Sequence, residues 1–204
     1  MKWLLGLLLA SVVWAGDEPR LFLSKSFPGS VPPYSQITVD KDGNVEYREA
    51  TDDDQPLKYR LTEGDTHEVF GLAEKLDYFK HPLESAAKVA FMGTKTFRYE
   101  NGGTTSETKF NYSEDPSARL LLDWFERMVE SAARRIDLER SAKYDHLGIV
   151  KSVLLLQFSI ENKRVVAPEQ FLPLLDRISK NEIYMHTARE RAAELADAIR
   201  KSLP

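Results

Sequence analysis

Residues 36–48 read QITVDKDGNVEYR, and this stretch decides the fold of the N-terminal half. Ile37 and Val39 alternate with polar residues before the central DKDGN segment, and Val45 and Tyr47 do so after it. Successive side chains of a strand point to opposite faces, so each run predicts a strand with one face in the core. The glycine of DKDGN supplies the positive φ that a tight turn needs, so we expect a hairpin here.

The same alternation recurs outward from this hairpin. Strict alternation favours an antiparallel sheet that packs one face on a core and exposes the other. Asn101-Gly102-Gly103 predicts a second hairpin tip. The further strand segments are Leu21–Leu23, Leu57–Leu61, Phe97–Tyr99 and Phe110–Tyr112.

One helix is expected between these strands. Thr62 is the expected N-cap, because its side-chain oxygen can accept a hydrogen bond from a free N–H of the first turn. The helix should end near Phe79, ahead of His81-Pro82. Its apolar stripe consists of Val69, Phe70, Leu72, Ala73 and Leu76.

After Ser113 the apolar period changes from two to 3.6, which predicts helices. Asp115 should cap the first of them and Pro116 should occupy its first turn. We expect Trp124 and Phe125 to anchor this helix on the apolar face of the sheet. The expected helices span about 116–144, 147–161, 168–180 and 184–202, with a kink at Pro173 in the third.

The predicted fold class is therefore α+β: an antiparallel sheet with a helix on its inner face, followed by an all-helical C-terminal extension. Residues 16–115 would form the antiparallel α+β domain, and residues 116–204 the C-terminal helices packed on or beside it.

Residues 1–15 read as a signal peptide. One lysine is followed by an apolar run, and Val13 and Ala15 place small side chains at the −3 and −1 positions of a cleavage site. The run is shorter than the ~20 residues of a membrane span, so cleavage is expected rather than anchoring. We therefore expect an exported protein of a bacterial periplasm or exterior, which meets the membrane only during export.

Charge and cysteine content exclude several classes. The chain carries a net charge of -4, and the acidic excess lies in residues 16–115. Nucleic-acid binding needs a basic footprint that neutralises phosphates, so no nucleic-acid partner is expected. The chain has no cysteine, which excludes disulfides, thiol catalysis and cysteine metal sites.

The segments Pro33–Val39 and Asp42–Tyr47, followed by a capped helix and a second hairpin, resemble a small secreted α+β module of unknown function from bacteria. The cysteine often found ahead of the Pro-x-Tyr of that module is absent here. The segment Asn181–Leu195 is similar to the tails of uncharacterised exported proteins of the acidobacterial type. The resemblance covers about residues 20–130 and implies no established activity.

No catalytic, cofactor or metal motif stands out. The four histidines, His67, His81, His146 and His186, lack the i, i+4 spacing of a helical zinc site. The glycine of DKDGN comes fourth, whereas an EF-hand calcium loop needs it sixth. No Gly-x-Ser-x-Gly is present, so a serine hydrolase is not indicated. We therefore predict no cofactor and favour a protein that is not an enzyme.

The face of the sheet opposite the core carries a basic excess, and it is the candidate docking face. One interpretation is a ladder of cross-strand ion pairs with Glu46, Glu100 and Glu107. The other is a docking site for a protein or an anionic envelope component. The basic residues are Arg48, Lys58, Arg60, Arg98 and Lys109.

The leading functional hypothesis is an exported, non-enzymatic binding or interaction module. A first alternative is an exported hydrolase that uses dispersed carboxylates, because glycosidase chemistry needs only two acids a few ångströms apart. A second alternative is a structural or assembly role, in which the C-terminal helices cover the sheet.

Overall fold

The computed structural model describes residues 18–203 of the chain. The proposed signal peptide, residues 1–15, lies outside the described residues. Between residues 18 and 203, none of the helices combines the length and apolar composition of a membrane span.

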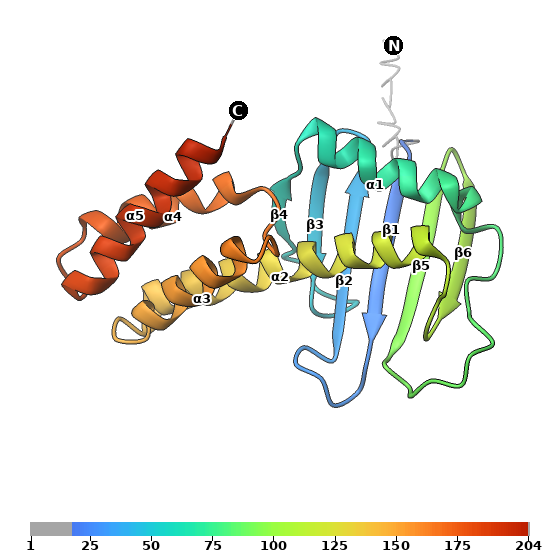
Figure 1. The fold of residues 1–204 in the computed structure, drawn as a ribbon, viewed down its shortest axis with the longest axis horizontal. Helices are drawn as coiled ribbons and strands as arrows, with labels where there is room; N and C mark the ends of the chain where they lie inside the picture. Colours follow the sequence, from blue (N-terminus) through green and yellow to red (C-terminus); the bar gives the residue numbers. More distant parts are fainter. Residues whose placement is uncertain (1–17, 204) are drawn as a thin grey trace, which may run out of the picture.

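Within this range six strands form one antiparallel sheet in the order β4-β3-β2-β1-β5-β6 (Figure 1). The two predicted hairpins are β2–β3 and β5–β6, and β1 lies between them. Leu23 of β1 lies opposite Ile37 on one side and Phe97 on the other. The strands are β1 (Arg20–Ser26), β2 (Tyr34–Asp40), β3 (Asn44–Arg48), β4 (Leu57–Arg60), β5 (Thr94–Asn101) and β6 (Thr104–Phe110).

One helix separates the strands and the others follow the sheet, which confirms the predicted α+β class with a helical extension. The α-helices are α1 (Glu63–Lys75), α2 (Pro116–Tyr144), α3 (Ile149–Glu161), α4 (Leu172–Lys180) and α5 (His186–Ser202). Two 3₁₀ helices, η1 (Asp77–Phe79) and η2 (Pro168–Phe171), precede β5 and α4.

Both predicted N-caps are confirmed. The Thr62 hydroxyl accepts a hydrogen bond of 3.1 Å from the backbone N–H of Asp65. The Asp115 carboxylate accepts bonds of 2.7 and 3.0 Å from the N–H groups of Ser117 and Ala118. Each cap satisfies N–H groups that have no partner within the helix.

The helix expected to reach Phe79 ends at Lys75 instead. Asp77, Tyr78 and Phe79 have positive φ values, which an α-helix does not allow. This left-handed segment turns the chain so that the buried Phe79 ring lies 5.4 Å from that of Phe97. Tyr78 stacks on Tyr99 with ring centroids 4.4 Å apart.

The helix expected over 168–180 is divided in two. The 3₁₀ helix η2 ends at Phe171, and α4 begins at Leu172 with Pro173 in its first turn. Proline is tolerated there because the N–H it lacks would have no helical partner. Pro173 thus marks a helix start rather than a kink.

The inner face of the sheet is covered by α1 and α2, which lie side by side across the strands (Figure 1). This first core includes the inward residues of all six strands, the stripe of α1 and the first half of α2. Trp124 and Phe125 are both buried in it, so the predicted anchor of α2 is confirmed. The indole N–H of Trp124 also donates to a carboxylate oxygen of Glu68 on α1, at 3.1 Å.

Helix α2 is too long for the sheet. Strands about 4.8 Å apart give a six-stranded sheet a width of about 24 Å, whereas a helix of 29 residues is about 43 Å long. It therefore runs past the edge strand β4 (Figure 1). Its last residues need another apolar partner, and α3, α4 and α5 supply it.

We call the last two turns of α2, from Leu138, together with α3, η2, α4 and α5 the helical arm. The arm extends beyond the β4 edge of the sheet (Figure 1) and has its own apolar core. The hydroxyl of Tyr184 donates to the carbonyl oxygen of Ala142 in that core, at 2.8 Å. The C-terminal helices therefore pack on the sheet through the first half of α2 and lie beside it through the rest.

Candidate functional site

The five predicted docking residues lie together on the outer face of the sheet. The strand register places Lys58 opposite Glu46 and Arg98 opposite Glu107. All five side chains alternate with buried inward residues such as Tyr47 and Phe97. The alternation in the sequence therefore placed them on the correct face.

Glutamates on the same face partner most of these cations. Glu46 contacts both Arg48 at 2.8 Å and Lys58 at 2.9 Å. A hydrogen bond from Lys58 is the main reason why the pKa of Glu46 lies below its ordinary value, and Arg48 adds to the effect. This end of the face is an ion-pair ladder.

The other half of the outer face is paired in the same way. Arg98 contacts Glu100 at 2.8 Å and Glu107 at 3.6 Å, and Lys109 contacts Glu107 at 3.1 Å. The Arg98 guanidinium also lies 3.9 Å from the centre of the Phe22 ring. Such local pairs leave little unbalanced charge for a ligand, since each cation already has an anionic neighbour.

Arg60 is the exception among the five. Its guanidinium donates to the backbone carbonyl oxygen of Asp42 at 3.0 Å and forms no ion pair with any residue in 18–203. Among the five predicted docking residues, Arg60 is therefore the one cation without a carboxylate partner within residues 18–203, and it lies at the β4 edge of the face.

One polar row lies on the inner face and was missed by the sequence reasoning. Lys25 and Lys95 face each other across β1 and β5, and Lys95 is only 3% exposed. The Lys95 ammonium donates to the carbonyl oxygens of Asn111 at 2.5 Å and Met92 at 3.3 Å. Burial, followed by repulsion from Lys25, lowers the pKa of Lys95. The strand alternation through Phe97 and Leu23 could have predicted both positions.

Lys95 has a structural task that its contacts explain. It ties the segment before β5 to the end of β6, next to a cavity of about 190 Å³. Two of the three donors of its ammonium are used on backbone carbonyls, so its contacts are those of a structural lysine.

The histidines do not assemble into a site. His81 lies 3.3 Å from Asp77, and His186 lies 3.2 Å from Glu190, each as a surface pair. His146 stacks edge-on against Tyr184. Across residues 18–203, no three histidine or acidic side chains gather closely enough to hold a metal ion.

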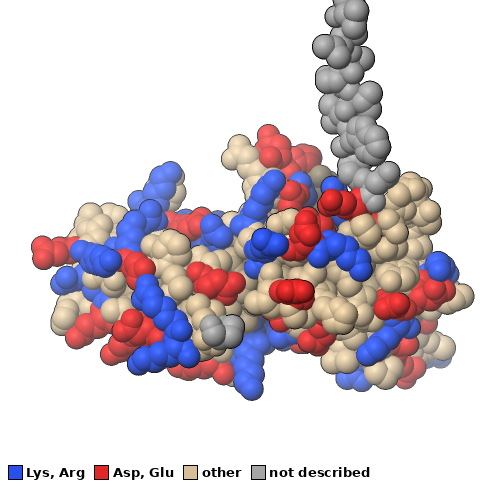
Figure 2. Space-filling model, turned by 90° about the horizontal axis from the view of Figure 1, so that it is seen from above, with Lys and Arg blue, Asp and Glu red and all other residues tan. Residues whose placement is uncertain are grey.

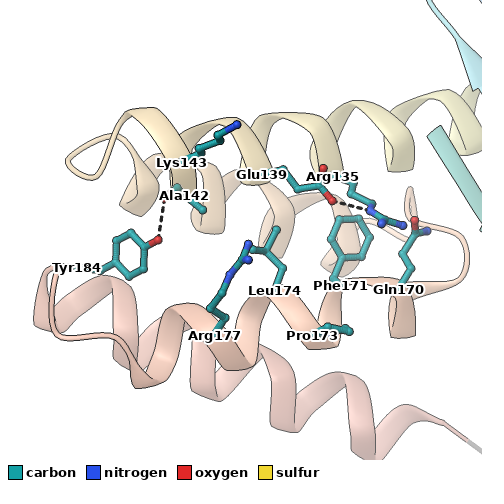
Figure 3. Close-up of a pocket in the computed structure, with 10 residues that line it drawn as sticks. All are labelled: Arg135, Glu139, Ala142, Lys143, Gln170, Phe171, Pro173, Leu174, Arg177 and Tyr184. Atoms are coloured by element: carbon teal, nitrogen blue, oxygen red, sulfur yellow. Dashed lines mark hydrogen bonds and ion pairs between the residues drawn. The ribbon is translucent and has the colours of Figure 1, made fainter. Parts of the chain in front are cut away.

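A groove on the helical arm is a concave site of mixed character. It lies between α2 and the η2–α4 segment and has a volume of about 600 Å³. Volumes of this order are typical of sites for small molecules and cofactors. Figure 3 shows its lining: Arg135, Glu139, Ala142, Lys143, Gln170, Phe171, Pro173, Leu174, Arg177 and Tyr184. We call this site the arm groove.

The floor of the arm groove is apolar and its rim is basic. Phe171, Leu174 and Tyr184 are buried beneath it. Arg177 reaches from α4 toward α2 (Figure 3) and forms no ion pair within the described part of the chain. Arg135 is paired with Glu139 at 3.0 Å, and Glu139 is the one acidic residue among the ten that line the site.

One acceptor in the groove lacks a partner. The side-chain oxygen of Gln170 is buried and accepts no hydrogen bond from residues 18–203, while its amide donates to Val166 at 3.1 Å. Buried polar atoms are normally paired, so this oxygen is an exception in the wall of the groove. Sequence reasoning missed this site because its two walls are far apart in the chain.

Comparison with protein families and with curated proteins gives no indication of the function. No protein-family model matches the chain, and no curated protein matches it significantly.

Proposed function

We propose that this is an exported, non-enzymatic interaction module that binds an acidic segment of a partner protein in the arm groove. The observation that carries the proposal is the combination of an apolar floor with a rim of Arg135, Lys143 and Arg177. A concave site focuses the field of its charges more than a flat surface does. Figure 2 shows acidic and basic side chains interspersed on the face seen from above, so the partner would recognise a local site rather than a broad charged surface.

The dimensions favour a peptide. Arg135 and Lys143 are eight residues apart on α2, which corresponds to about 12 Å along the helix. An extended chain covers about 3.3–3.6 Å per residue, so three to four residues of a partner would span the groove. Apolar side chains of that segment would lie against the exposed Pro173, above the buried Leu174, and its carboxylates would face Arg177 and Lys143.

A binding role is also supported by the absence of buried acids. No Asp or Glu between residues 18 and 203 is buried. A hydrolase with two carboxylates needs at least one of them in an environment that raises its pKa, and burial is the usual cause. Asp123 and Glu130, which are both held by Arg164, lie partly exposed.

Binding of a fluorescein-labelled Glu-Leu-Glu-Leu-Glu peptide to the chain from residue 16 onward tests the proposal. We expect saturable binding that weakens as salt rises, because ion pairs at the rim are screened. Arg177→Glu should weaken binding at least roughly tenfold, which corresponds to about 1.4 kcal/mol.

Arg140→Glu is the matched control. Arg140 is an exposed arginine of α2, the helix that forms the other wall of the groove, but it does not line the groove. It makes the same charge change, so it should leave the affinity almost unchanged. Equal loss in both variants, or equal binding of a Lys-Leu-Lys-Leu-Lys peptide, would rule out the arm groove as the site.

A further inference from the structure

Helix α3 is apolar on two sides. One side, with Ile149, Val153 and Leu156, is fully buried in the core of the arm. The opposite side exposes Leu154, Leu155 and Phe158, which are 48%, 36% and 62% accessible. A helix on the surface of a protein normally has a polar outward side, and an apolar one marks an interface.

These exposed residues form a continuous stripe. At 3.6 residues per turn, positions 151, 154, 155, 158 and 161 fall on one side of a helix. All five are exposed. Leu147 lies just before α3, is 79% exposed, and adds another exposed apolar side chain next to the helix. We call Lys151, Leu154, Leu155, Phe158 and Glu161 the α3 stripe.

The α3 stripe ends in opposite charges. Lys151 begins it and forms no ion pair within residues 18–203, and Glu161 ends it with a single side-chain contact of 2.7 Å from the amide of Gln157. The two positions are ten residues apart, or about 15 Å along the helix. The middle of the stripe carries no charge.

This order of charges is self-complementary. If a second copy of α3 packs antiparallel on the first, Lys151 of each copy meets Glu161 of the other, and Leu154 of each meets Phe158 of the other. Such a pairing is a twofold, isologous contact, in which residue i contacts j and j contacts i. A parallel pairing would place lysine against lysine and glutamate against glutamate.

We propose that the protein self-associates into a dimer through antiparallel packing of the α3 stripe on a second copy of this chain. A single helix stripe buries less than the roughly 1,200–2,000 Å² of a typical stable interface. The dimer is therefore weak and depends on protein concentration. The α3 stripe does not overlap the lining of the arm groove, so peptide binding and self-association are separate properties.

Sedimentation equilibrium of the chain from residue 16 onward, from about 5 µM to about 500 µM, tests the dimer, because weak association needs this range of concentration. We expect a monomer–dimer equilibrium. Phe158→Ser should remove it. Leu120→Ser is the control, since Leu120 is an exposed leucine of α2 outside the stripe. It should leave the association constant unchanged.

A charge exchange tests the antiparallel register. Lys151→Glu places glutamate against glutamate at both ends of the contact, so the dissociation constant should rise roughly tenfold. Adding Glu161→Lys to the same chain rebuilds both ion pairs in reverse, so the double variant should dimerise like the wild type. Thermal melts of each variant show whether it is folded.

A wild-type chain that stays monomeric throughout this range overturns the proposal. A dimer that survives Phe158→Ser, or a double variant as weak as Lys151→Glu, equally contradicts it, because the contact would then lie elsewhere or have another register. Peptide binding in the arm groove should be the same for all these variants.

Discussion

The hydroxyl of Tyr59 on β4 donates a hydrogen bond of 3.0 Å to the backbone carbonyl oxygen of Met128 on α2. Tyr184 makes the equivalent bond to Ala142, further along the same helix. Each tyrosine lies in a different apolar core. The two bonds therefore fix α2 to the sheet at one point and to the arm at another.

Replacing either tyrosine by phenylalanine should lower the free energy of unfolding by about 0.5–1.5 kcal/mol, the usual net contribution of one hydrogen bond. The two changes should be additive, because the sites are well separated and share no partner. Urea denaturation of Tyr59→Phe, Tyr184→Phe and the double variant measures this. If the double variant is as stable as either single variant, the two hydrogen bonds do not contribute independently and the prediction is wrong.

Stability should fall in alkaline solution because of Tyr59. Burial, with a smaller effect of Tyr47, raises the pKa of Tyr59 well above its ordinary value of 10.0. Above about pH 10 the unfolded chain loses this proton while the folded chain keeps it, so each pH unit costs up to about 1.4 kcal/mol per such group. Urea denaturation at about pH 8 and about pH 11 should show a smaller loss for Tyr59→Phe than for the wild type. Equal losses would contradict the assignment.

Phe125→Ala should lower the free energy of unfolding by about 3–5 kcal/mol, because it removes a buried aromatic ring between α2 and the sheet. Leu120→Ala is the control on the same helix, since Leu120 is 56% exposed. It should change stability by no more than about 0.5 kcal/mol. Indistinguishable melts of Phe125→Ala and wild type would refute the packing of α2.

Charge reversals on the outer sheet face separate a docking role from simple solubility. Arg98→Glu would place three acids together with Glu100 and Glu107 and remove the stacking on Phe22, so it should reduce stability more than Arg60→Glu. If the face binds an anionic partner, the Arg60/Arg98 double reversal should abolish its pull-down from an extract, and salt should weaken the wild-type complex. A partner that the double variant retains, with no salt dependence, would exclude this face.

Processing of the N-terminus is tested on the exported protein. The order of one lysine, an apolar run, Val13 and Ala15 predicts cleavage after Ala15. N-terminal sequencing should then begin at Gly16. A mature chain that still begins at Met1 would contradict the signal peptide.

The sheet and its helix caps were predictable because their signals are local. Gly43 in its turn, Thr62 and Asp115 each act within a few residues, and alternation assigned most strand side chains to the correct face. Tyr34 follows the same rule, since it stands two residues before the outward Gln36, lies on the outer face and donates to Gln36 at 2.8 Å.

The missed features depend on contacts between distant segments. The left-handed segment Asp77–Phe79 contains no glycine, and its conformation is maintained by the burial of Phe79 against Phe97. The arm groove needs Arg135 and Arg177 from different helices. The extension of α2 past β4 could have been predicted from the sequence, because the predicted helix was already longer than the predicted sheet is wide.

Helix α2 belongs to both apolar cores, and its place in the chain decides when the sheet is covered during synthesis. All six strands are complete at Phe110, and α1 covers part of the apolar face they form, but the rest is covered by Ala118 to Ala132, which follow them in the chain. A chain made from its N-terminus therefore presents a finished set of strands whose apolar face is only partly covered until this part of α2 has been made. If the chain is exported unfolded, as its predicted signal peptide implies, a core that is completed only by residues 118–132 would stay incomplete until these residues have been made.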